Sequence, residues 1–272
     1  MAHARARALS ALATFALIAG CGGGQSVSSS PTTGELPTTA TSTPHTGTSA
    51  PHRSIQLADD QALAQRAVLR LADVPGGYKS LPAENTPAND VPAAVAAHFS
   101  ACTHLALPLV TTLLDQRAGP GMILVVSPNF VKPVSKLAET SIESAVEVHA
   151  SSEQLSQELD QLGSAGALPC WKAFIKSSFA DPAGSSAALR ALDVASVPLG
   201  ALGDQSTAVG AKVAVSNGVR TIDIALDFCI VRRGRADAVL AFAVEGGGSV
   251  DRALERSLLA KMVDRLPTSI RS

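Results

Sequence analysis

Apolar and polar residues alternate most regularly in the last third of the chain. Residues 222–228 read Ile-Asp-Ile-Ala-Leu-Asp-Phe, and this period of two predicts a strand with one buried face and one wetter face. Asn217-Gly218, just before it, is the typical sequence of a two-residue type I′ turn. Such a turn pairs Val213 with Ile222 in an antiparallel hairpin.

A second turn follows at residues 232–234. A three-residue loop there, with Gly234 in the left-handed conformation, pairs Leu226 with Leu240. A two-residue loop would place Leu226 opposite Ala241 and mix the two faces, so the three-residue loop is predicted. The three strands then form an antiparallel meander.

A closing amphipathic helix is predicted after the glycines at 246–248, from apolar residues at helical spacing: Val250, Leu254, Leu258, Met262 and Leu266. Earlier helices are predicted over 58–72, from Pro92, from Ser151 to Gly163 and from Pro169, and earlier strands over 122–126 and 145–150. This order of elements predicts an α+β fold, a single domain in which an antiparallel sheet, with the meander at its C-terminal end, packs against helices.

The chain begins with a short apolar run. Residues 8–19 carry no charge and follow Arg5 and Arg7, and a run of about 12 residues is shorter than the ~20 that span a bilayer as a helix. A positive start, a short apolar stretch and small residues at its end are typical of an export signal. The end of the run, Ile18-Ala19-Gly20-Cys21, resembles the bacterial lipoprotein signal, which implies removal of residues 1–20 and lipidation of Cys21. The alternative is an ordinary secretory signal with a chance cysteine.

Residues 21–56 consist largely of Gly, Ser, Thr and Pro. With almost no apolar bulk to bury, this segment is predicted to be a disordered tether. We expect it to hold the folded domain, residues 57–272, away from the membrane surface. The lipid on Cys21 would anchor the protein to the extracytoplasmic face of the cell membrane.

Composition narrows the range of partners. A net charge of −1 lacks the basic excess of a nucleic-acid binder, and 3% aromatic residues provide few stacking platforms. No nucleic-acid partner is therefore expected. No second run of 18 apolar residues occurs, so no membrane span is expected beside the lipid.

Three cysteines remain after Cys21. A disulfide is plausible in an exported protein, and Cys102–Cys170 is the favoured pair because both residues lie next to helix-like segments. Cys229 lies inside a predicted strand. The alternative is three buried free thiols.

The sequence contains none of the common catalytic motifs. Ser206 is the nearest approach to a nucleophile elbow, but the pattern Gly-x-Ser-x-Gly is missing, as are Cys-x-x-Cys and a Gly-rich phosphate loop. His98 and His104 are six residues apart, which does not place two ligands on one helix face, and with His149 they are interpreted as surface histidines. We therefore predict no catalytic residue, no cofactor, no metal site and no enzymatic activity.

A group of arginines and a pair of aspartates are also candidate binding or catalytic residues. Arg232, Arg233 and Arg235 cluster at the predicted hairpin tip, where they could bind anionic headgroups or an acidic partner. The alternative is a solvated turn. Asp223 and Asp227 lie four apart in a strand, about 13 Å by strand rise, and are interpreted as part of a solvated face.

The domain resembles the extracytoplasmic domains of actinobacterial, mycobacterial-type lipoproteins and of receptor-kinase sensor modules. The resemblance rests on the turn at 73–78, the pair Cys102 and Cys170, and the hairpin and helix of 232–266, and it brings no catalytic motif. We expect a non-catalytic ligand-binding or sensor-accessory lipoprotein of the cell envelope, whose partner is a small apolar ligand or another envelope protein. The alternatives are an extracytoplasmic hydrolase with a dispersed Ser/His/Asp site and a partner-binding structural protein.

Overall fold

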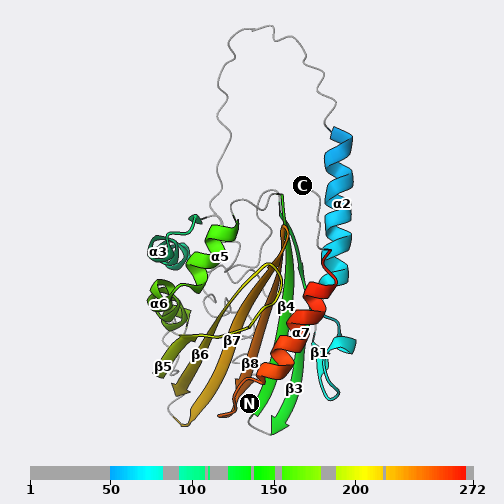
Figure 1. Cartoon of the computed structure of the whole chain (residues 1–272). Coiled ribbons are helices and arrows are strands. Elements are labelled where there is room, and N and C mark those ends of the chain that lie inside the picture. Colours follow the sequence, from blue (N-terminus) through cyan, green and yellow to red (C-terminus); the bar gives the residue numbers. More distant parts are fainter. Residues whose placement is uncertain are drawn as a thin grey trace, which may run out of the picture.

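A long antiparallel sheet organises the molecule, and helices cover both of its faces (Figure 1). The computed structural model describes residues 50–81, 92–107, 110, 122–135, 138–150, 155–178, 188–216 and 219–267. The predicted signal peptide, Cys21 and residues 21–49 of the predicted tether lie outside these ranges.

The eight strands follow the order β1-β3-β4-β8-β7-β6-β5, and β2 also pairs with β4. Their bounds are β1 Lys79–Leu81, β2 Met122–Val126, β3 Asn129–Ser135, β4 Ala138–His149, β5 Ala188–Ser196, β6 Gln205–Ser216, β7 Thr221–Arg233 and β8 Ala236–Glu245. All pairs are antiparallel, so the α+β fold with an antiparallel sheet is confirmed, and its last three strands form the expected meander.

Helices α3 (Ala93–Thr103), α5 (Leu155–Gly163) and α6 (Leu168–Ser178) lie on one side of the sheet, and α2 (Ala50–Ala67) and α7 (Arg252–Asp264) on the other (Figure 1). Two short 3₁₀ turns, η1 (Leu71–Asp73) and η2 (Ala165–Ala167), connect elements. Helix α2 begins before residue 58, where the pattern predicted its start, so residues 50–56 are helical. The cap of α7 is Asp251, whose carboxylate accepts the backbone N–H groups of Ala253 and Leu254.

Both faces of the central strands are buried, so the wetter face predicted for β7 is wrong along most of that strand. On the α2/α7 side, Cys229, Leu240 and Phe242 pack with Leu258 and Met262. On the opposite side, the core includes Val209, Leu226, Val239, Phe99 and Trp171, together with apolar residues of α5. The reason is tertiary: helices packed on both sides of the sheet remove both sets of side chains from water.

The β6–β7 hairpin differs from the expected register by two residues. Val213 pairs with Ile224, and the strands end at Ser216 and Thr221, so four residues connect them instead of two. An even shift keeps each side chain on its predicted face, because the side chains of a strand alternate with a period of two.

The β7–β8 register was predicted wrongly. Leu226 lies opposite Ala243 instead of Leu240, and Arg233 pairs directly with Ala236. The loop therefore has two residues, with Gly234 at φ +62° in the first position, where a type II′ turn requires glycine. Because this shift of three residues is odd, each side chain of β8 lies on the face of the sheet opposite to the predicted one.

The predicted disulfide between Cys102 and Cys170 is confirmed, and it joins α3 to α6. Cys229 is a free, buried thiol in β7. Beside the bridge, Phe99 packs edge-on against Trp171 and Phe174, and the indole N–H of Trp171 donates to the carbonyl of Leu162. The bridge thus fastens the aromatic part of one core.

Removing this bridge should destabilise the domain substantially. For a sequence separation of 68, the chain-entropy model predicts a loss of about 4 kcal/mol in the free energy of unfolding for the Cys102→Ser/Cys170→Ser double variant. Urea denaturation with and without dithiothreitol measures it. The double variant should be insensitive to the reductant, whereas a Cys229→Ala control should lose stability on reduction as the wild type does.

Candidate functional site

Four ionisable side chains meet on the α5 side of the sheet, where β4, β8 and β7 run side by side. Glu147 of β4 lies directly opposite Asp237 of β8, and Asp237 lies opposite Arg232 of β7. His149 is two residues beyond Glu147 and therefore on the same face. We call Glu147, His149, Arg232 and Asp237 the strand-end cluster.

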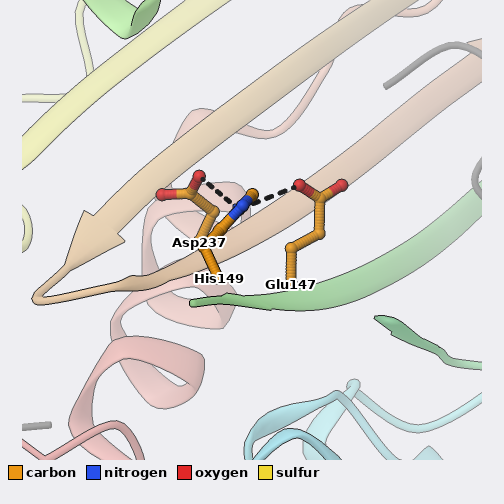
Figure 2. A group of neighbouring side chains, drawn as sticks. All are labelled: Glu147, His149 and Asp237. Carbon is orange, nitrogen blue, oxygen red and sulfur yellow. Dashed lines mark ion pairs between the residues drawn. The ribbon is translucent and has the colours of Figure 1, made fainter. Parts of the chain in front are cut away.

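The cluster is buried and closely packed (Figure 2). Arg232 forms a bidentate pair with Asp237, in which Nε lies 2.8 Å from Oδ1 and Nη2 lies 2.7 Å from Oδ2. The imidazole Nε2 of His149 lies between two carboxylates, 3.4 Å from an Asp237 oxygen and 3.5 Å from a Glu147 oxygen. Among the residues that the structure describes, His149 Nε2 and Arg232 Nη1 are buried without a hydrogen-bond partner.

The β7–β8 turn holds the backbone of His149 in place. The amide of His149 donates to the carbonyl of Arg235 at 2.9 Å, and Arg235 Nη1 donates to the carbonyl of His149 at 2.7 Å. The same guanidinium pairs with Asp60 of α2, which ties that helix to the sheet. The backbone of His149 is therefore tied to the β7–β8 turn and, through Arg235, to α2.

The arginines near this turn are not available to headgroups or to an acidic partner, as one interpretation of the sequence suggested. Arg232 and Arg235 are buried in ion pairs with Asp237 and Asp60. Arg233 donates to the carbonyl of Val263, at the end of α7. The alternative of a solvated turn is wrong for Arg232 and Arg235, whereas Arg233 is half-buried.

The electrostatics favour positive charge at His149. Burial lowers the pKa of His149, but Asp237 and Glu147 outweigh that effect and raise it to about 9. Burial likewise raises the pKa of Asp237, but its contacts with His149 and Arg232 prevail and hold it below its usual value. Burial raises the pKa of Glu158, a carboxyl of α5 that interacts electrostatically with Arg232, His149 and Asp237. The two carboxylates therefore favour the protonated, positively charged form of His149.

Sequence reasoning interpreted His149 as a surface histidine, and the structure corrects this. The signal that could have indicated the site is Glu147-x-His149 in a predicted strand, which places both side chains on one face. The third member could not be found, because the sequence pattern assigned strand 145–150 no pairing partner, and Asp237 reaches Glu147 only through the pairing of β4 with β8. His98 and His104 are exposed, as expected.

A second buried ionic group lies on the opposite face, under α7. Asp227 accepts a hydrogen bond from Arg252, which also lies 3.4 Å from Glu255. Asp227 is thus buried instead of solvated, while Asp223 is exposed as predicted. Burial, together with the neighbouring Asp227, raises the pKa of Glu255 to about 8. Burial also raises the pKa of the Cys229 thiol, which makes it a poor nucleophile at neutral pH.

Comparisons with known proteins leave the family open. No protein-family model matches the chain, and no curated protein matches it. A solved structure that matches is LpqN of Mycobacterium tuberculosis, described as involved in cell envelope biogenesis, with a TM-score of 0.25, 11% identity, and coverage of 54% of this chain and 78% of that one. A TM-score of this size carries no argument about function. Within the described residues, no helix is long and apolar enough to span a membrane.

The buried carboxyl of Glu255 predicts a pH-dependent stability. Its pKa of about 8 in the folded chain exceeds the ordinary 4.5, so the folded chain binds this proton more tightly than the unfolded chain. Stability should therefore fall as the pH rises from ~4.5 to ~8. Glu255→Gln keeps the shape of the neutral carboxyl and should lack this decline, gaining at least about 1 kcal/mol over wild type between about pH 5 and pH 9.

Urea denaturation across that pH range measures the difference between the two proteins. The exposed carboxylate Asp193, replaced by Asn, serves as the matched control and should leave the slope unchanged. Parallel pH profiles for wild type and Glu255→Gln would contradict the prediction.

Proposed function

We propose that the protein is a lipid-anchored binding module on the extracytoplasmic face of the cell membrane. The observation that carries this proposal is Ile18-Ala19-Gly20-Cys21 at the end of a short apolar run, followed by a Gly/Ser/Thr/Pro-rich segment. The disulfide supports it, because such bonds form and persist outside the reducing cytosol. In this proposal, residues 21–49 connect the lipid to helix α2, which begins the folded domain.

The domain is proposed to act by binding instead of by catalysis. It presents a rigid sheet covered on both sides, and its ionisable side chains form ion pairs instead of a recognisable nucleophile and base. The partner is proposed to be a small ligand or another envelope protein. Lipid that co-purifies with the protein would support a carrier of apolar ligands, a crosslinked membrane protein would support a partner-binding module, and labelling by a serine-reactive probe would favour a hydrolase instead.

The anchor is tested by replacing the lipid-attachment residue without blocking export. In the Ile18→Ala/Cys21→Ala variant, small residues occupy the positions that an ordinary signal peptidase reads, so the chain should be exported, cleaved and released. Detergent phase partitioning should place the native chain with the detergent and the variant in the aqueous phase. Mass spectrometry should find a diacylglyceryl group on the native Cys21.

Cys229→Ala is the matched control, since it removes a cysteine that is buried in β7. It should partition with the detergent as the native chain does. An unmodified Cys21 in a native chain that partitions into water would refute the anchor and leave the fold unaffected.

A further inference from the structure

We propose that Glu147, His149 and Asp237 bind a divalent transition-metal ion, with Zn²⁺ as the representative. The metal ion would be the small ligand of the proposed binding module. Only its location at the cell envelope rests on the proposed function. Binding of the metal by the folded chain does not require the lipid anchor.

The possible ligand atoms lie at distances that suit a metal ion. One nitrogen of His149 and one oxygen from each carboxylate all lie within 4.8 Å of one another. The separations of 3.4 and 3.5 Å from the imidazole nitrogen are longer than a normal N–H···O hydrogen bond of about 2.7–3.2 Å. In a tetrahedral site with bonds of 2.0–2.2 Å, ligand atoms stand about 3.4 Å apart. The two distances from His149 therefore match this spacing, and the two carboxylate oxygens lie within 4.8 Å of each other.

The imidazole Nε2 of His149 is buried, and its two ion-pair contacts do not have hydrogen-bond geometry. His149 is 9% exposed, and its Nε2 points between the two carboxylates without a hydrogen bond to any described residue (Figure 2). A buried polar atom without a partner is uncommon and calls for an explanation, such as an ion. Coordination of a metal would satisfy it.

Neighbouring side chains hold the possible ligands in place. Arg232 orients the carboxylate of Asp237 through two hydrogen bonds, and Arg235 fixes the backbone carbonyl of His149. Metal ligands in proteins are commonly held in this way by outer hydrogen bonds. Glu158 contributes a further buried oxygen without a partner among the described residues, and it interacts electrostatically with the cluster from α5.

The ligand set also indicates the class of metal. Two carboxylates neutralise a divalent ion, and an imidazole nitrogen is favoured by zinc and the neighbouring transition metals. Ca²⁺ takes six to eight oxygen ligands, and Mg²⁺ is usually held by carboxylates and several waters, so neither matches a set of three that includes histidine.

The test uses the full lipidated chain, purified in detergent, stripped with a chelator and titrated with Zn²⁺ by calorimetry. Co²⁺ is added in parallel, because its visible absorption reports tetrahedral coordination by the protein. Wild type should bind one Zn²⁺ per chain. His149→Gln and Glu147→Gln should weaken binding by at least the roughly 10–100-fold that loss of an outer-shell partner costs.

His98→Gln is the matched control, because this exposed histidine lies on α3 and away from the cluster. It should retain the wild-type affinity and the Co²⁺ spectrum. Circular dichroism shows whether each variant is folded, and Glu147→Gln keeps the test valid if His149→Gln does not fold.

A folded wild-type chain that binds neither ion would overturn the proposal and identify the cluster as an ion-pair network. Unchanged binding by folded His149→Gln and Glu147→Gln would overturn it too, since the ion would then sit elsewhere. Either result leaves the anchor untouched, because the partitioning experiment is independent of metal. Conversely, a chain that binds Zn²⁺ and lacks lipid would retain this inference and refute the anchored function.

Discussion

The two-residue turn at Gly234-Arg235 is the constraint on which the remaining structure depends. It sets the register of β8 against β7, and that register decides which of the two cores each side chain of β8 enters. Arg235, the second turn residue, then reaches back to the carbonyl of His149 and to Asp60. One turn therefore aligns the central strands, ties α2 to the sheet and fixes the end of β4.

Burying charged side chains on both faces of a sheet costs free energy, and different groups offset this cost on the two faces. On the α5 side, Asp237 stays ionised because Arg232 and His149 bring positive charge to it. Under α7, Arg252 faces both Asp227 and Glu255, and burial beside Asp227 raises the pKa of Glu255. The cluster on the α5 side thus holds its acid ionised, whereas the group under α7 favours the protonated form of one acid.

The sequence was sufficient for the features that depend on local pattern. The strand at 222–228, the closing helix and the antiparallel α+β class were predictable because period-two and helical spacing are local signals. The disulfide followed from its place beside helical segments. The burial of both faces of the sheet could not be predicted, because it depends on the packing of α2 and α7 against one face in the folded chain.

The register between β7 and β8 could not be predicted for the same reason. Two loop lengths fitted the sequence at Gly234, and the choice between them rested on assigning Leu240 and Phe242 to the core with Leu226. In the structure both faces are core, so apolar character could not decide between them. The wrong choice also moved Asp237 off the face of Arg232, and Glu147 joins them only through the pairing of β4 with β8, which the sequence pattern did not predict.

The composition of that cluster is itself an argument about its role. Well-packed apolar residues of similar volume are often as stabilising as a buried ion pair, or more so, so stability alone gives little reason to place four ionisable groups inside a sheet. The arrangement has a specific feature: the bidentate pair of Arg232 and Asp237 is complete, whereas His149 stands between carboxylates at distances too long for good hydrogen bonds. A metal ion held between the three side chains, as proposed above, would account for these distances and for the buried Nε2 that has no hydrogen bond.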